Sequence, residues 1–178
     1  MKADIDLTVT YPHPIDQVWA ALTSAEALAA WLMPNDFQPV VGHRFTFWTK
    51  PAPGFDGIVR CQVLELDPPR RIAWSQAGGK IDTTVTFTLE PADERRTRLR
   101  MHQVGFHGLG AQITRRILAG GWPGILRERL AAYLDSPAGP DPAARPIPDQ
   151  GAEGWRAYLS VFRGRRHTPA KRAADPAK

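Results

Sequence analysis

The stretch VWAALTSAEALAAWLMP, residues 18–34, predicts two short amphipathic helices, which follow an expected strand over residues 5–11. Trp19 and Leu22 share the apolar face of the first helix. Ser24 is suited to cap the second helix, whose apolar side includes Trp31. Helices this short are not stable alone, so both must be held by packing. Their two tryptophans belong either to a plain core or to the wall of a cavity that holds an apolar guest.

Strands are expected on both sides of this stretch. Apolar and polar residues alternate over residues 5–11, 43–48, 57–66, 81–90 and 97–103, as in strands with one dry face. A further short strand is expected at IAWS, residues 72–75. Turns such as DPPRR, which contains two prolines, join successive strands. Short connections of this kind indicate an antiparallel meander.

The hydrophobic period changes after the last strand. Apolar residues such as Ile113, Ile117 and Leu130 recur at helical spacing, which predicts a helix from Ala111 to about Leu134. The sequence AGGWPG interrupts this pattern with two glycines and a proline. Because these residues are costly inside a straight helix, a kink is expected, or a break with Pro123 near the first position of the second half.

The chain therefore predicts an α+β domain over residues 1–135, followed by an appendage. Residues 136–150 contain five prolines and are expected to form a linker. Residues 151–163 are expected to form a short amphipathic helix, which either docks on the domain or on a second copy of the chain or stays mobile. Residues 164–178 are basic and are expected to be disordered.

Charge and cysteine content limit the partners. The net charge is +5, but residues 1–135 carry 15 Lys plus Arg against 14 Asp plus Glu, so the basicity belongs to the tail. This distribution argues against a nucleic-acid-binding surface, and no membrane partner is expected. The single cysteine excludes an intramolecular disulfide. With no apolar signal region and no spanning stretch, a cytoplasmic location is expected.

None of the residue patterns in the sequence indicates a particular catalytic reaction. Cys61 shares a strand face with Val59 and Val63, which favours an inert buried thiol. His102 and His107 lack the spacing and companions of metal ligands, and no glycine pattern fits a nucleotide phosphate, so no metal and no cofactor are expected.

Two polar residues remain as candidates for a pocket. Glu65 has the same parity as Cys61, so its carboxylate either points inward or is rotated out by a bulge or by strand twist. His102 is expected to face solvent, and a role as a pocket acid or base is the alternative.

Several motifs, in this order, resemble one known family. YPHPIDQVWAALT, LAAWLMP, VVGHRFTFW, TVTFTLEP, TRLRMHQVGF and GGWPGILRERLAAYL are similar to the motifs of the activator-of-heat-shock-protein-90-ATPase homologues, a branch of the START-like SRPBCC superfamily. The resemblance runs from about Asp4 to Leu134. It implies a helix-grip fold, in which a curved antiparallel sheet of about six or seven strands wraps around a long C-terminal helix, with two short helices after the first strand.

The resemblance also implies a cavity between sheet and helix, which in many relatives holds an apolar or aromatic molecule. The function expected is a binding module for such a ligand, whose identity the sequence does not give. The alternatives are a cyclase, dehydratase or hydrolase that uses Glu65 or His102, and a co-chaperone-like domain with a protein partner, either monomeric or homodimeric. The residues expected to contact the ligand are Trp31, Met33, Phe45, Phe47, Val59, Cys61, Val63, Trp74, Phe87, Met101, Trp122 and Leu126.

Overall fold

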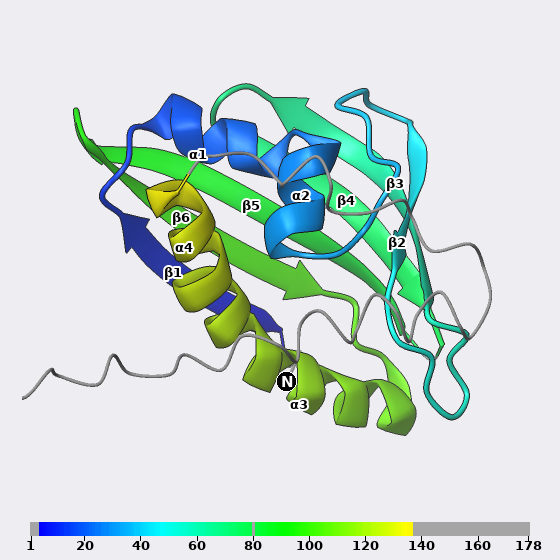
Figure 1. Cartoon of the computed structure of the whole chain (residues 1–178). Helices are drawn as coiled ribbons and strands as arrows, with labels where there is room; N and C mark the ends of the chain where they lie inside the picture. Colours follow the sequence, from blue (N-terminus) through cyan, green and yellow to red (C-terminus); the bar gives the residue numbers. More distant parts are fainter. Residues whose placement is uncertain (1–3, 80, 137–178) are drawn as a thin grey trace, which may run out of the picture. The chain divides into compact units, whose positions relative to one another are not determined.

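The computed structural model describes residues 4–79 and 81–136 (Figure 1). The linker after residue 136, the short amphipathic helix expected over residues 151–163 and the basic tail expected over residues 164–178 lie outside these residues. The described elements follow the expected α+β order: β1 (Ile5–Tyr11), α1 (Ile15–Leu22), α2 (Ala25–Trp31), β2 (Arg44–Trp48), β3 (Ile58–Asp67), β4 (Arg71–Gly78), β5 (Ile81–Asp93), β6 (Arg96–Val104), α3 (Gly108–Gly124), the π-helical segment η1 (Ile125–Leu130) and α4 (Ala131–Asp135).

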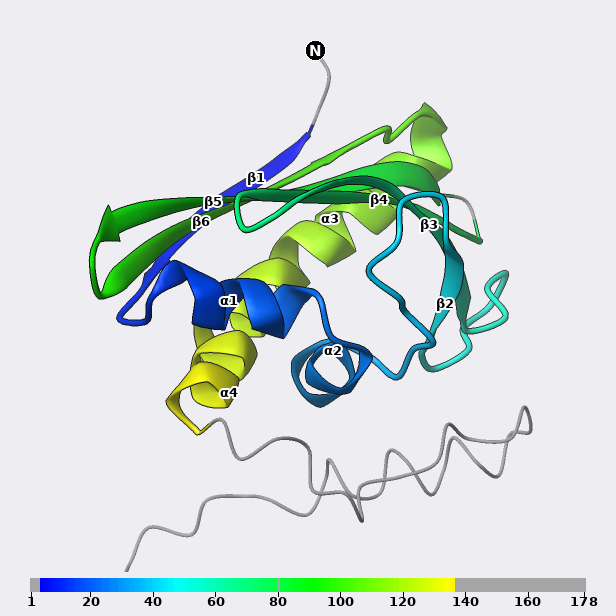
Figure 2. The same ribbon diagram turned by 90° about the horizontal axis from the view of Figure 1, so that it is seen from above.

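The six strands form one antiparallel sheet in the order β1-β6-β5-β4-β3-β2. Strands β2 to β6 are a meander, and β1 closes the far edge by pairing with β6. The chain therefore has to cross from one edge of the sheet to the other between β1 and β2. Figure 2 shows that α1 and α2 make this crossing on the same face of the sheet as α3 and α4. This arrangement is the helix-grip fold.

The two short helices are held as expected. The Ser24 side chain accepts a hydrogen bond from the amide of Ala27 at 3.2 Å and caps α2. The Trp31 side chain is fully buried, and its indole N–H donates to the carbonyl of Ala21 at 2.8 Å. Since this bond joins the end of α2 to α1, the tryptophan fixes one helix against the other.

The C-terminal helical region runs from residue 108 to 135 without a break, so of the two alternatives expected at Pro123, a kink or a break, the break is excluded. Pro123 lies inside α3, and the irregularity follows it as η1, which has the wider π-helical pattern. Proline has no amide hydrogen and cannot complete the regular ladder of helical hydrogen bonds, so a local change of pattern is a reasonable response. None of the helices in the described ranges combines the length and hydropathy needed to cross a membrane.

Candidate functional site

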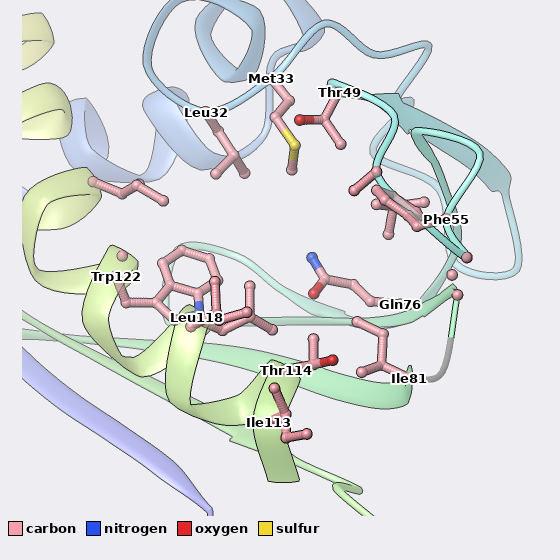
Figure 3. Close-up of a pocket in the computed structure, with 18 of the residues that line it drawn as sticks. Leu32, Met33, Thr49, Phe55, Gln76, Ile81, Ile113, Thr114, Leu118 and Trp122 are labelled. Carbon is pink, nitrogen blue, oxygen red and sulfur yellow. The ribbon is translucent and has the colours of Figure 1, made fainter. Parts of the chain in front are cut away.

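A cavity of about 660 Å³ lies between the sheet and the C-terminal helical region (Figure 3). Four parts of the chain line it: Leu32 and Met33 after α2, the loop 49–55 after β2, the inner ends of the strands at Val59, Gln76 and Ile81, and one side of α3 and η1. Its volume lies within the range typical of small-molecule sites.

Most of the lining is apolar. Figure 3 shows the side chains of Leu32, Met33, Phe55, Leu118 and Trp122 around the cavity. Methionine and leucine side chains adapt readily to the shape of an apolar guest. The helical wall begins in α3 and continues through Ile125 and Arg129 of η1. The π-helical segment is therefore part of the cavity wall. Irregularities of this kind in helices are frequent at functional sites.

The mouth of the cavity is also apolar. Ile113 and Ile117 line the cavity, yet they are 66% and 69% exposed. Leu109 lies one further turn toward the start of α3 and is 89% exposed. These three residues recur every four positions, so they form one exposed stripe along the helix beside the opening.

Among the residues that the structure describes, the lining contains few polar side chains, namely Thr49, Gln76, Thr114 and Arg129, and no carboxylate, imidazole or thiol. The Thr114 hydroxyl donates back to the carbonyl of Gly110 at 3.3 Å, which leaves it engaged within its own helix. Over residues 4–79 and 81–136, no group of His, Cys, Asp and Glu side chains could hold a metal ion. The cavity thus offers shape and a small number of hydrogen bonds.

One polar cluster lies at the floor of the cavity. The Trp122 indole N–H donates to Gln103 Oε1 at 2.9 Å. Gln103 Nε2 donates to Thr83 Oγ1 at 3.0 Å and to Gln76 Oε1 at 3.3 Å. Thr83, Gln103 and Gln76 are all buried. Of the three, only Gln76 lines the cavity.

The residues expected to contact a ligand divide into two groups. Met33, Val59 and Trp122 line the cavity. The other nine are buried in the core and are not part of its lining: Trp31, Phe45, Phe47, Cys61, Val63, Trp74, Phe87, Met101 and Leu126.

The aromatic members of the second group pack mainly against one another. The Phe45 and Phe47 rings lie 5.2 Å apart, as do the rings of Trp74 and Phe87. These aromatic side chains therefore form a packed core next to the cavity. Residues such as Phe55, Gln76, Ile81 and Leu118 were not among the expected lining. The sequence signals for this wall were the apolar spacing of α3 and the alternation of the strands, which gives Gln76 and Ile81 an inward parity.

The two candidates for acid–base chemistry lie outside the cavity. The pairing of β3 with β4 shifts at a bulge between Val63 and Glu65, so the Glu65 carboxylate is rotated outward and accepts a hydrogen bond from Arg71 Nε at 2.8 Å. His102 is partly exposed, with Nε2 at 3.6 Å from Asp4 Oδ2. The Cys61 thiol is buried, and burial raises its pKa, as expected for an inert cysteine.

Known proteins that resemble this chain share its fold. The family model for "Activator of Hsp90 ATPase homolog 1-like protein" matches residues 12–135. The solved structure of protein MLL2253 from Mesorhizobium loti is 32% identical, with a TM-score of 0.66, over 74% of this chain and 96% of that one. Protein BH1534 from Bacillus halodurans is 25% identical, with a TM-score of 0.62, over 75% of this chain and 99% of that one.

A third solved structure is similar in fold. The Aha1 dimer from Colwellia psychrerythraea is 20% identical, with a TM-score of 0.63, over 77% of this chain and 99% of that one. None of the curated proteins matches the chain.

Proposed function

Because the chain belongs to the Activator of Hsp90 ATPase homolog 1-like family of the START-like SRPBCC superfamily, we propose that it is a binding module whose cavity holds an apolar or aromatic small molecule. The observation that carries this proposal is the cavity of about 660 Å³ between the sheet and α3, with its largely apolar lining. A cavity of this volume buries most of the surface of a small ligand.

The mouth of the cavity supports the same function. Ile113 and Ile117 would lose exposed apolar surface to any ligand that fills the opening. Removing such surface from water favours association. Ligand capture would therefore give the exposure of Ile113 and Ile117 a physical role.

The chemistry of the lining favours binding over catalysis. General acid–base catalysis needs a titratable group within hydrogen-bond reach of the reacting atoms. Glu65 and His102, the two candidates for an enzyme, are not among the lining residues. A ligand in the cavity would meet mainly apolar side chains, together with a few hydroxyl and amide groups.

A homodimer is a secondary proposal. The Colwellia relative is described as a dimer, and Leu109, Ile113 and Ile117 expose a contiguous apolar stripe on α3 that a second copy could cover. Light scattering of the full chain and of an Ile117→Ser variant tests this. A mass that falls from dimer to monomer in the variant supports it, and a monomeric parent protein overturns it.

The binding function is tested with the fluorescent ketone 6-propionyl-2-(dimethylamino)naphthalene, whose emission moves to shorter wavelength in apolar surroundings. The full chain is expected to bind it and shift its emission. Leu118→Trp adds bulk to the cavity wall and is expected to weaken binding about tenfold or more, as overpacking of an occupied site does.

Leu64→Trp is the matched control, because Leu64 is an exposed leucine of β3 outside the lining. The control variant is expected to bind the probe like the parent protein. Failure of the parent protein to shift the emission, or equal weakening by both substitutions, would contradict the proposed site.

A further inference from the structure

At the floor of the cavity, each of three neighbouring strands has a polar residue where the pattern of its inner face calls for an apolar one. Along the inner face, Trp74 is followed by Gln76 in β4, Val85 is preceded by Thr83 in β5, and Met101 is followed by Gln103 in β6. Gln76 and Thr83 are paired directly across the sheet. Buried side-chain amides are costly unless their hydrogen-bonding groups have partners.

The orientation of this cluster follows from a single donor. An indole N–H can only donate, so the atom of Gln103 that faces Trp122 at 2.9 Å must be its amide oxygen. The Gln103 amide nitrogen is then directed toward Gln76 and Thr83, at 3.3 and 3.0 Å. The group of Gln76 that receives this donor must be its oxygen.

The consequence lies at the cavity. With its oxygen turned toward Gln103, Gln76 directs its amide nitrogen into the pocket, as Figure 3 shows. Gln76 is only 6% exposed, and Nε2 makes no hydrogen bond to any of the residues that the structure describes. This donor faces the cavity, where the apolar side chains around it offer no acceptor, so a ligand that fills the cavity has to supply one.

We propose that the Gln76 amide is the polar recognition point of the cavity and selects ligands that carry an uncharged hydrogen-bond acceptor, such as a ketone, ester or amide carbonyl, within an otherwise apolar body. This inference rests on the proposed binding function and specifies the ligand class. A carboxylate is excluded at this point, because one neutral amide donor does not offset the desolvation of a buried charge.

The test uses two probes of nearly identical shape, 2-acetylnaphthalene and 2-isopropenylnaphthalene, in which a C=CH2 group replaces the carbonyl. Dissociation constants of both are measured with the full chain and with Gln76→Met, which keeps the length of the side chain and removes the amide. The preference for the ketone over the hydrocarbon is expected to fall about tenfold in the variant, the size of one buried hydrogen bond.

Gln62→Met is the matched control. Gln62 belongs to the neighbouring strand β3, is not part of the lining, and donates from Nε2 to the carbonyl of Gly42 at 3.2 Å. This variant is expected to keep the preference of the parent protein. A change of equal size in both variants would overturn the proposal.

A second readout uses the unaltered protein, so it does not depend on the stability of a variant. In nitrogen-15 NMR spectra, an Nε2 proton of Gln76 is expected to move downfield with the ketone and to stay unchanged with the hydrocarbon. If both probes bind and neither the proton shift nor the ketone preference is seen, the assignment of Gln76 is wrong and the binding function stands. If neither probe binds, the proposed function fails and this inference fails with it.

Discussion

The hydroxyl of Tyr11, the last residue of β1, donates a hydrogen bond of 2.7 Å to the carbonyl of Leu126 in η1, across 115 residues of sequence. Both residues are buried. A carbonyl oxygen can accept two hydrogen bonds, so the tyrosine supplies a side-chain donor to a buried carbonyl of the π-helical segment. The bond therefore fixes the irregular part of the cavity wall to the edge of the sheet.

Replacing Tyr11 with phenylalanine is expected to lower the free energy of unfolding by about 1–3 kcal/mol, because the Leu126 carbonyl is left buried without its donor. Urea denaturation of the two proteins measures this difference. Tyr133→Phe is the control, since Tyr133 is partly buried and its hydroxyl makes no hydrogen bond to the described residues. Equal destabilisation by the two variants would show that the Tyr11 bond is not significant.

The bond from Trp122 to Gln103 supports a second prediction. Trp122→Phe keeps an aromatic ring but leaves Gln103 Oε1 without its donor, and a loss of about 1–3 kcal/mol is expected. Trp122→Ala also opens a cavity, and a loss of about 3–5 kcal/mol is expected. Thermal unfolding monitored by circular dichroism measures both. Trp19→Phe, at a partly buried tryptophan of α1, is the comparison, and the prediction fails if it costs as much as Trp122→Phe.

Much of the fold was accessible from local pattern. The alternation in IDTTVTFTLE depends on burial of one face, and the structure buries Val85, Phe87 and Leu89. The helical spacing after Ala111 also predicted a helix correctly, although Ile113 and Ile117 are exposed at the mouth of the cavity. The course of the chain at Pro123 was not accessible, since the cost of a proline does not say whether a helix breaks or changes its hydrogen-bond pattern.

The candidate site was harder to predict because core and cavity wall have the same composition. Period-two alternation places Phe87 and Met101 on the inner face, but it does not show where α3 stands away from the sheet. The orientation of Glu65 depended on a bulge, which one extra residue creates without a sequence signal of its own. The polar end of the inner face at Gln76 and Gln103 had the right parity and could have been recognised.

The pairing of Asp6 with Arg100 predicts an acid-dependent loss of stability. Asp6 accepts hydrogen bonds from Arg100 Nε at 3.0 and 3.2 Å, and this hydrogen bonding lowers the pKa of the carboxyl below its usual 3.8. Because the pKa of Asp6 is lower in the folded than in the unfolded protein, the ionised carboxylate stabilises the fold at pH values above the unfolded-state pKa. This contribution is lost as the pH falls through the folded-state pKa. Both groups are largely exposed, so the effect is expected to be small and to decrease with salt.

The measurement is the urea midpoint at pH 7 and at pH 3, in low and high salt, for the parent protein and for Asp6→Asn. The variant is expected to lose stability at pH 7 and to show a smaller decline between the two pH values. Asp82→Asn is the control, because Asp82 is exposed and makes no ion pair within the described part of the chain. If both variants give the same pH profile, the pair with Arg100 does not contribute.

The final prediction concerns Cys61, the single cysteine of the chain, whose thiol is buried and lies 3.6 Å from the carbonyl of Val59. Burial raises the pKa of this thiol, so the reactive thiolate is scarce in the folded protein even at pH 8.

Iodoacetamide at pH 8 is therefore expected to modify Cys61 only as fast as the domain opens, and to modify it rapidly in 6–8 M urea, a range chosen to unfold a domain of ordinary stability. Mass spectrometry of timed samples follows the reaction. Because the fraction of open protein is set by stability, Tyr11→Phe is expected to accelerate the modification about tenfold for each 1.4 kcal/mol of lost unfolding free energy. Rapid modification of the parent protein without denaturant would show that the strand carrying Cys61 is accessible in the native state.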